Sequence, residues 1–356
     1  MPQSGKTTVF NALTRGQAES SGASGSATET HLGVVKVPDA RLDRLAKMFN
    51  PKKVVPAEVK YFDLPGLGSV AQSQGITGLQ RNLLQTTDAF LLVVRAFNNP
   101  AVVHPLGDSN PQRDLETMLG ELTFSDLEIL DRAVGRLEDG IKKAKQTERP
   151  AMTRHLEAMV KAKEALERGT PMRRQALSDS ETHFLADYQL LTYKPVIVAF
   201  NTDEAAPDLT LDQLNLSSDL REGLGEVNLS AKLEAELALM SDEEEAEFRR
   251  ELGLGESAMS RVIVVSYETV GLVSFLTVGS DEVRAWSVPA GIPAQEAART
   301  IHTDFQRGFI RAEVISYPDL DRCGSLAEGR KGGLLRSEGK TYPVKDGDVI
   351  NFLISV

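Results

Sequence analysis

Short apolar runs alternate with amphipathic stretches along most of this chain. Several of the runs are typical of buried strands in a parallel sheet, because each is almost wholly apolar and lies close to a polar or glycine-bearing turn. They cover Val54–Phe62, Ala89–Ala96, Pro195–Phe200 and Val262–Val265. The spacing between them predicts helices, for example over Asp39–Phe49 and Gly78–Thr86. This alternation predicts an α/β fold with a doubly wound, mainly parallel sheet, in which ligands bind at the carboxyl ends of the strands.

A different pattern lies between the second and third predicted strands. Ser125 and Glu128 form a capping box that predicts the start of a helix, and Pro150 interrupts the helical run that follows. A second helical stretch ends at Gly169–Pro171. The pattern predicts an antiparallel helical hairpin inserted at residues 123–187. Its first helix has apolar residues every three or four positions: Phe124, Leu127, Leu130, Val134, Leu137, Ile141 and Ala144.

The pattern changes again after about Ser274. Residues in Val283–Val288 alternate between apolar and polar, and Pro293–Thr303 has helical spacing. Two further strands are predicted over Arg311–Ser316 and Val349–Val356. We therefore expect a small α+β domain of a size that folds independently. The predicted division is a sheet domain over residues 1–122 and 188–273, the hairpin over 123–187, and the small domain over 274–356.

Composition narrows the classes of function. The chain has 356 residues, a net charge of −11 and a single cysteine, Cys323. The negative charge argues against attraction of naked nucleic acid by the whole surface, and we expect no sequence-specific DNA partner. One cysteine cannot form an internal disulfide and fits a reducing cytosol. No apolar run approaches the roughly 20 residues that span a membrane, so we expect a cytoplasmic protein with no membrane partner.

The first residues carry the second half of a phosphate-binding loop, G-x-x-x-x-G-K-[ST]. Gly5-Lys6-Thr7 stands so near residue 1 that the first glycine and its preceding strand are missing, and we expect the natural protein to start upstream. In such loops the backbone N–H groups, here those of Gly5 to Thr8, face phosphate oxygens. Lys6 would neutralise charge between the terminal phosphates, and the Thr7 hydroxyl would hold Mg²⁺.

A D-x-x-G motif follows the first predicted strand. Asp63 is placed to hold the water shell of Mg²⁺, and the N–H of Gly66 to sense the terminal phosphate. A surface β-turn is the alternative interpretation of these residues. The next residue, Leu67, occupies the place where Ras-like enzymes carry a glutamine that orients the attacking water. A leucine cannot hydrogen-bond water, so another polar group must take this role or turnover is slow.

Two later motifs indicate a nucleobase site. Asn201-Thr202-Asp203-Glu204 follows a predicted strand, and Ser230-Ala231-Lys232 resembles the S-A-K loop that closes over the base in GTPases. The corresponding GTPase motif, N-K-x-D, binds guanine through its aspartate. Here Glu204 stands in that place, and its longer side chain would not bring the carboxylate to the guanine donors. We therefore expect Asn201 and Glu204 to flank the base, with Ser230 and Ala231 above it.

These motifs, in this order on strand ends, give the chain a specific resemblance. It resembles the YchF/Obg-like ATPase family of P-loop proteins, essentially from end to end. The resemblance implies a G domain, an inserted helical hairpin and a C-terminal TGS domain of β-grasp-like fold. It implies ATP rather than GTP as the preferred substrate, Mg²⁺ as cofactor, and association with the ribosome, through its large subunit or ribosomal RNA. The matching segments include Gly33–Asp39, Asp63–Leu67, Glu282–Trp286, His302–Phe305 and Val344–Phe352.

The resemblance also identifies a candidate catalytic side chain. The family has a histidine implicated in turnover, in a mobile loop after the strand that follows D-x-x-G, and His104 is at the matching position. An imidazole can orient water near pH 7; a surface histidine without a role is the alternative. The family's Mg²⁺-linked threonine falls on Ala27, which leaves Thr28 and Thr30 as substitutes.

The sequence thus predicts a Mg²⁺-dependent ATPase that acts as a nucleotide switch near the translation machinery. One alternative is a GTPase of the Obg-related class with the same site residues. Another is a nucleotide-gated ribosome-binding protein with negligible hydrolysis. The last alternative is that the chain, as written, is an unstable fragment.

Overall fold

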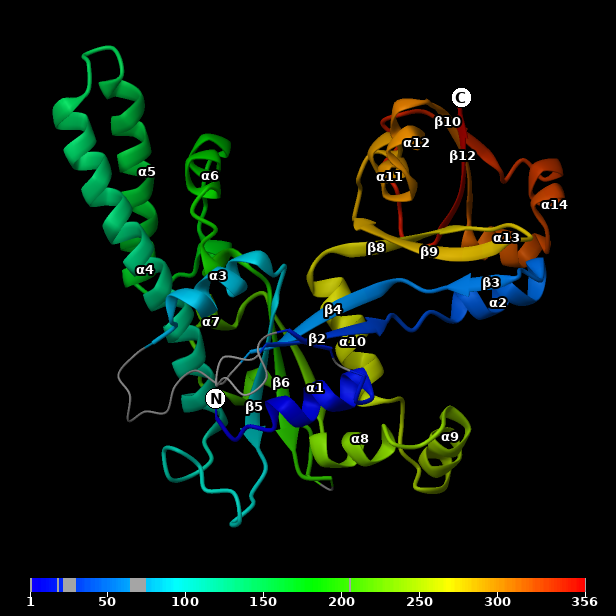
Figure 1. Ribbon diagram of the computed structural model, residues 1–356, viewed down its shortest axis with the longest axis horizontal. Helices are drawn as coiled ribbons and strands as arrows, with labels where there is room; N and C mark the ends of the chain where they lie inside the picture. Colours follow the sequence, from blue (N-terminus) through cyan, green and yellow to red (C-terminus); the bar gives the residue numbers. More distant parts are fainter. Residues whose placement is uncertain (1, 18, 22–29, 65–74, 205, 356) are drawn as a thin grey trace. The chain divides into compact units, whose positions relative to one another are not determined.

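The computed structural model describes residues 2–17, 19–21, 30–64, 75–204 and 206–355. Contacts divide the chain into two compact units (Figure 1). Unit 1 comprises Met1–Leu32 and Phe62–Ser266, and unit 2 comprises Gly33–Tyr61 and Tyr267–Val356. Residues 33–61 therefore group with the C-terminal residues, although the sequence pattern placed them with the sheet domain.

The core of unit 1 is a parallel three-stranded sheet in the order β5-β6-β7. Its strands are β5 (Phe90–Ala96), β6 (Val196–Thr202) and β7 (Leu224–Leu229). β6 is buried along Val196–Asn201 because it lies between two neighbours, which explains its unbroken apolar run. β5 and β6 match two predicted strands, whereas β7 was not predicted. The parallel sheet with its helices confirms the predicted α/β class.

A second three-stranded sheet has the order β1-β2-β4. It consists of β1 (Glu19–Ser21), β2 (Thr30–Lys36) and β4 (Glu58–Asp63). Among the described residues, β4 and β5 are not paired with each other, so the predicted single sheet is present as two. The last residue of β4 is Asp63, which places this carboxylate at a strand end as the sequence predicted.

One predicted strand is divided in the structure, and another is wrong. The run Val54–Phe62 is divided into β3 (Lys53–Val55) and β4, because Pro56 has no N–H to offer a sheet. The run Val262–Val265 lies inside helix α10 (Ala258–Thr269). Burial within α10 follows helical rather than strand spacing, since Met259, Val262, Ile263, Ser266 and Tyr267 are its buried residues. A run of four apolar residues is too short to distinguish the periodicity of a strand from that of a helix.

Helices α4 and α5 form the predicted antiparallel hairpin, side by side in Figure 1. Its buried core includes Leu130, Met159, Ala162 and Leu166. The predicted capping box at Ser125 is wrong, because α4 begins fourteen residues earlier, at Pro111, with Asn110 as its cap. Ser125 is buried within the helix, and its hydroxyl accepts a hydrogen bond from Arg81 Nε at 2.8 Å.

The helices with residues in unit 1 have the following bounds: α1 (Lys6–Thr14), α3 (Gly78–Thr86), α4 (Pro111–Lys143), α5 (Arg149–Glu167), α6 (Asp179–Ala186), α7 (Ser218–Arg221), α8 (Ala231–Leu237), α9 (Asp242–Glu251) and most of α10, with short 3-10 turns η1 (Met172–Arg174), η2 (Leu191–Tyr193) and η3 (Leu211–Gln213). The predicted helix Gly78–Thr86 is confirmed, with a capping box between Thr77 and Gln80. Helix α1 contacts α8, so the two helices that follow the phosphate loop and the S-A-K loop lie against each other.

A buried carboxylate fixes the chain just before β6. Asp126 of α4 accepts hydrogen bonds from Leu191 N, Thr192 N and the Thr192 hydroxyl, each at 2.7 Å. Burial raises the pKa of the Asp126 carboxyl to about 6, against the opposing effect of these hydrogen bonds. The hairpin and the start of β6 are therefore held together by one side chain.

Unit 2 contains a six-stranded mixed sheet in the order β11-β10-β12-β8-β9-β3. The hairpin β8–β9 is antiparallel, β12 pairs parallel to β8, and β3 adds a parallel strand beside β9. The strands are β3, β8 (Leu272–Thr277), β9 (Glu282–Pro289), β10 (Phe309–Ser316), β11 (Arg336–Glu338) and β12 (Asp348–Ile354). The helices are α2 (Ala40–Phe49), α11 (Ala294–Ile301), α12 (Thr303–Arg307), α13 (Tyr317–Cys323) and α14 (Leu326–Lys331).

Helix α2 belongs to the packing of this C-terminal sheet. It contacts β9 and α13, and its Leu42 and Leu45 are buried. Arg41 and Arg44 form ion pairs with Asp346 and Asp321, each at 2.6 Å. These contacts, together with β3, explain why residues 33–61 belong to unit 2. No helix in the described part of the chain is both long enough and apolar enough to cross a membrane.

Candidate functional site

Gly5 sets the start of helix α1 and the turn before it. Its φ is +87°, a left-handed backbone conformation that favours glycine. A Cβ at this position would lie 2.3 Å from Asn201 Nδ2, which is closer than any real contact. Helix geometry leaves the first N–H groups of α1, those of Lys6, Thr7 and Thr8, without acceptors inside the helix. Gly5 therefore permits a turn that presents backbone donors, as a phosphate site requires.

The structure brings together three residues that the sequence assigned to phosphate and metal. Lys6 Nζ forms an ion pair with the Asp63 carboxylate, and the Thr7 hydroxyl donates to Asp63 Oδ2 at 3.1 Å. The Asp63 side chain is 6% exposed and that of Lys6 is 29% exposed. Two of the residues start α1 and the third ends β4, so the group forms where a helix N-terminus meets a strand end. We call Lys6, Thr7 and Asp63 the phosphate-side group.

The donor types of this group suit Mg²⁺. A hydroxyl and a carboxylate are the hard oxygen ligands that Mg²⁺ prefers, and this ion keeps several of its waters, so few protein ligands are needed. The Thr7 and Asp63 oxygens are already within hydrogen-bond distance of each other. The described residues contain no cluster of three or more His, Cys, Asp or Glu that would form an all-protein metal cage. The residues therefore fit an ion shared with a phosphate ligand better than a structural metal.

Asn201, at the end of β6, joins two loops of the site. Its Nδ2 donates to the Ser4 carbonyl at 2.9 Å, and its Oδ1 accepts from Ala231 N at 2.9 Å. Asn201 is 4% exposed and Ser4 is 1% exposed. The sequence placed Asn201 beside a nucleobase, but here both ends of its amide bind protein backbone. Its role in this structure is to hold the phosphate loop and the S-A-K loop in register.

Glu204 lies near the S-A-K loop on the more exposed side of the site. Its Oε1 is 3.3 Å from Lys232 Nζ, and the side chains of Lys232 and Glu204 are 77% and 48% exposed. The Glu204 carboxylate raises the pKa of Lys232 through this contact. Ser230 is the N-cap of helix α8, with no capping hydrogen bond from its side chain, and Ala231 beside it is buried. The structure therefore gathers the predicted base-side residues at the ends of β6 and β7.

Sequence reasoning missed the contacts of Asp203. Its Oδ2 accepts a hydrogen bond from the backbone N–H of Asn98, at the start of the loop after β5, at 3.2 Å. The contact joins the base-side segment to residues 97–110, which we call the His104 loop. In the sequence, Asp203 is marked only by its position between Asn201 and Glu204, the two residues for which that motif was selected.

His104 is not part of the phosphate-side group in this structure. It is 4% exposed, and its Nε2 is 2.7 Å from Asp114 Oδ2 in the first turn of α4. Its Nδ1 accepts a hydrogen bond from Leu106 N at 3.1 Å. With this acceptor role at Nδ1, the proton of a neutral ring is on Nε2, toward Asp114. Both ring nitrogens are thus occupied by protein.

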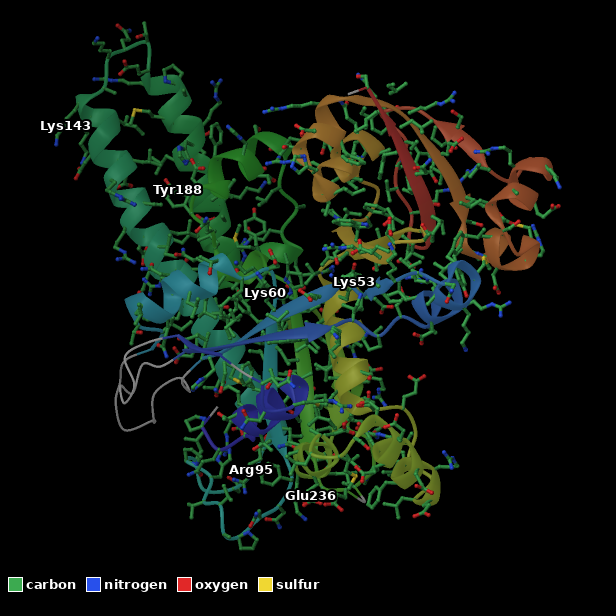
Figure 2. The ribbon with its side chains drawn as sticks, turned by 45° about the vertical axis from the view of Figure 1, so that its right-hand side comes forward. Lys53, Lys60, Arg95, Lys143, Tyr188 and Glu236 are labelled. Carbon is green, nitrogen blue, oxygen red and sulfur yellow. The ribbon has the colours of Figure 1, made fainter. Side chains whose placement is uncertain are left out.

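Arg95 organises the start of the His104 loop. Figure 2 labels this buried residue near the end of β5. Its guanidinium donates to the carbonyls of Val102 at 2.8 Å and Asn99 at 3.2 Å. The guanidinium also lies 4.4 Å from the ring centre of Phe97, a cation–π distance. The sequence pattern showed Arg95 only as a charge inside an apolar strand.

Several predicted site residues lie outside the described part of the chain. These are Gly66 and Leu67 of the D-x-x-G segment and, from the switch stretch, Ala27 and Thr28. Thr30 is described as the first residue of β2. The phosphate-sensing, water-orienting and switch threonine assignments therefore stay predictions.

Two family models match this chain. One, described as "50S ribosome-binding GTPase", matches residues 1–130. The other is the model of a YchF GTPase C-terminal region, described as "Protein of unknown function (DUF933)", and it matches residues 272–355. The first match includes the beginning of unit 1 and residues 33–61 of unit 2, and the second lies in the C-terminal part of unit 2.

Curated relatives match the chain along its whole length. A protein named "Ribosome-binding ATPase YchF" in Haemophilus ducreyi is 37% identical over 359 residues, covering 100% of this chain and 98% of that protein. Proteins of the same name in Bacillus subtilis and Escherichia coli O157:H7 are 36% and 37% identical, with the same coverage of both chains.

Solved structures match as well. The YchF GTPase of Schizosaccharomyces pombe superimposes with a TM-score of 0.82 at 30% identity, covering 99% of this chain and 96% of that one. A GTP-binding protein of Pyrococcus horikoshii OT3 superimposes with a TM-score of 0.58 at 17% identity, which supports the fold alone.

Proposed function

This chain belongs to the YchF family of P-loop nucleotide triphosphatases, and on that basis we propose that it is a Mg²⁺-dependent ATPase that acts as a ribosome-associated nucleotide switch. The observation that carries the proposal is the phosphate-side group. Lys6, Thr7 and Asp63 come from the start of α1 and the end of β4, and they contact one another. A cation, a hydroxyl and a carboxylate beside a helix N-terminus are the parts that phosphoryl-transfer sites use.

The proposed division of labour follows from these contacts. When nucleotide binds, Lys6 exchanges its ion pair with Asp63 for the terminal phosphates, since both are charge-assisted contacts of similar kind. Thr7 and Asp63 would hold Mg²⁺, which would neutralise charge on the phosphates. The N–H groups of Lys6 to Thr8 contact phosphate oxygens, and Gly66 senses the terminal phosphate. Leu67 offers no hydrogen bond to water, so His104 is the proposed water-orienting residue.

ATP is the proposed substrate because of the base-side residues. Glu204 stands where a guanine-binding aspartate would be, and Thr202 stands where that motif has lysine. The Thr202 hydroxyl donates to the Leu229 carbonyl at 3.3 Å, and Glu204 is paired with Lys232. These groups are occupied by protein partners rather than directed as a pair toward guanine. A GTPase with the same phosphate-side group is the alternative.

Competitive titration of the full chain with ATP and GTP tests the substrate. We expect ATP to bind about 5- to 150-fold more tightly, the factor that one unpaired buried polar group costs. Glu204→Asp should shift the preference toward GTP, and Asp208→Asn, on the segment that follows, is the matched control. Tighter binding of GTP by the unaltered chain would contradict the ATPase assignment.

Ribosome association is proposed from the relatives, which are named ribosome-binding ATPases. We propose the large subunit or ribosomal RNA as the contact, a cytoplasmic location, and three domains: the nucleotide-binding domain, the helical hairpin and a TGS domain. Co-sedimentation of the chain with ribosomal subunits, with and without ATP, tests the partner. The contact of His104 with Asp114 favours a second candidate, a nucleotide-gated binding protein with negligible hydrolysis, which would bind ribosomes normally after loss of turnover.

A further inference from the structure

We infer that Asp114 is a positioning residue that holds His104 in a retracted conformation, so that turnover requires the release of this contact. The inference rests on the proposed role of His104 in orienting water. It concerns a contact between two residues of unit 1, the buried pair His104 Nε2 and Asp114 Oδ2 at 2.7 Å. We call this conformation the retracted state.

The hydrogen bonds of the ring show that the retracted state is not a working dyad. A histidine that activates water gives one nitrogen to an orienting carboxylate and keeps the other free to accept from water. Here Nε2 contacts Asp114, and Nδ1 accepts from the N–H of Leu106 at 3.1 Å. The side chain is also only 2% exposed, so neither nitrogen reaches solvent. In this state His104 has no lone pair to offer.

The Asp114 carboxylate has a fixed position of its own. It is fully buried in the first turn of α4, where a helix favours negative charge. Its second oxygen, Oδ1, accepts from Arg113 Nε and from an Arg113 terminal nitrogen, each at 3.1 Å. These partners remain when His104 leaves, so release of the ring does not leave Asp114 as an unpaired buried charge.

The contact with Asp114 holds the most buried side chain of the His104 loop. Among residues 97–110, all of which the structure describes, His104 is the only buried one, and Val103 beside it is 73% exposed. The base of the loop is held separately, by Arg95 and by the contact of Asn98 N with Asp203. Arg113 also ties the exposed part of the loop to α4, because it donates to the Asp108 carbonyl at 2.8 Å and to the Asp108 carboxylate at 3.0 Å. A segment with one buried side chain and otherwise exposed contacts opens at low cost. Breaking the contact of His104 with Asp114 would therefore free the ring without unfolding β5.

The link to Asp203 gives nucleotide binding a route to this loop. Asp203 lies between the proposed base-side residues Asn201 and Glu204, and its carboxylate accepts from the first residues of the loop. A nucleotide that displaces the exposed residues Asp203 and Glu204 therefore changes the base of the His104 loop directly. The retracted state then prevails without substrate, and the released state is favoured once the site is filled.

Single-turnover hydrolysis of ATP by the full chain tests the inference. Asp114→Asn keeps the size of the side chain but replaces the charge-assisted hydrogen bond to His104 with a weaker, neutral one. We therefore expect the rate of ATP hydrolysis to rise about 5-fold or more. The matched control is Asp131→Asn, which removes an exposed partner of Lys163 further along α4 and lies outside the His104 loop. The control should hydrolyse ATP at the unaltered rate. An unchanged or lower rate in Asp114→Asn would overturn the inference.

Two companion variants separate this inference from the proposed function. His104→Ala should lower the rate about 10-fold or more with little change in ATP affinity. If it does not, the catalytic role of His104 is wrong. The double variant His104→Ala with Asp114→Asn should be as slow as His104→Ala alone. A gain from Asp114→Asn that survives in the double variant would show that Asp114 acts by another route.

A spectroscopic measurement decides the matter even if Asp114→Asn fails to fold. Nitrogen NMR of the unaltered chain reports the tautomer and hydrogen bonding of each histidine, and His104→Ala identifies the signal among the five. Without nucleotide we expect the proton on Nε2 and an accepting Nδ1. With ADP and aluminium fluoride, which imitate the transition state, this pattern should be lost. The same pattern in both conditions would overturn the inference.

Discussion

The two sides of the candidate site are built from contacts of different kinds. On the base side, Asn201 is buried, and both ends of its amide are hydrogen-bonded to the backbone of the phosphate loop and the S-A-K loop. On the phosphate side, Lys6 and Asp63 are paired with each other, although each is the type of group that a nucleotide or its metal would bind. The base side thus holds the scaffold, whereas the phosphate side consists of contacts that a ligand can replace.

The strands behind the two sides show the same difference. β6 is fixed before its start by Asp126, which binds Leu191 and Thr192, and at its end by Asn201. β4 ends at Asp63, whose side-chain partners come from the first turn of α1. Buried, fully paired polar groups resist change because a lost partner leaves a desolvated atom, whereas partly exposed ion pairs exchange at low cost.

Replacement of Asn201 should have the largest effect. Asn201→Ala leaves the Ser4 carbonyl and the Ala231 N–H without their partner, and we expect a loss of about 2–5 kcal/mol in the free energy of unfolding. ATP affinity should fall more than 100-fold, because the phosphate loop loses its support. Chemical denaturation and nucleotide titration measure the two effects.

Asn228 of β7 provides a matched control for Asn201. Its amide bridges the N–H and the carbonyl of Leu209, each at 2.9 Å, away from both loops. Asn228→Ala should destabilise the chain while ATP affinity is retained at the temperature where the variant is folded. If both variants bind ATP equally, Asn201 does not support the site.

Lys6→Ala should break the phosphate side without breaking the fold. The loss of charge-assisted contacts to phosphate should weaken ATP binding by about 10- to 150-fold. Asp63 keeps its hydrogen bond from Thr7, so the thermal melt should change little. Lys52→Ala, which removes the exposed partner of Asp281 in unit 2, is the control and should not affect ATP affinity. Undiminished binding by Lys6→Ala would remove the loop from the phosphate site.

The fixed start of β6 predicts an unusual dependence of stability on pH. Burial raises the pKa of Asp126 from its usual 3.8 to about 6, so the folded chain holds this proton more tightly than the unfolded chain. The resulting stability is fully present below about pH 4 and is lost as the pH rises through about 6. We expect the unfolding free energy, relative to Asp126→Asn, to fall by about 1–3 kcal/mol between pH 4 and pH 7. A difference that grows over this range would contradict the raised pKa.

The smallest effect is expected at the rim of the base side. Lys232 and Glu204 form an exposed ion pair, and such pairs contribute little to stability. Lys232→Ala should change the free energy of unfolding by less than about 0.5 kcal/mol and ATP affinity by less than about 5-fold. A large loss of affinity would place Lys232 in contact with the nucleotide. The Lys232–Glu204 pair would then be, like Lys6 and Asp63, a contact that a ligand replaces.

Much of the fold was predictable because local patterns report local structure. The helices predicted over Asp39–Phe49 and Gly78–Thr86 agree with the structure, since the periodic residues of each lie within one short segment. The errors arose where the pattern was too short or too evenly apolar. Val262–Val265 was assigned to a strand for this reason, and the start of α4 was placed at Ser125 because a capping box also occurs inside long helices.

The sequence by itself determined the family, the α/β class and the residue types of the candidate site, because these depend on motif order and spacing along the chain. Only the tertiary structure decided what these residues contact. Asn201 meets Ser4 across 197 positions, and Lys6 meets Asp63 across 57. Residues 33–61 join the C-terminal sheet through β3 and α2, and the hydrophobic periodicity within this segment does not indicate that pairing. The physical reason is that hydrogen bonds and ion pairs between distant segments depend on packing, whereas propensity and periodicity act within a few residues.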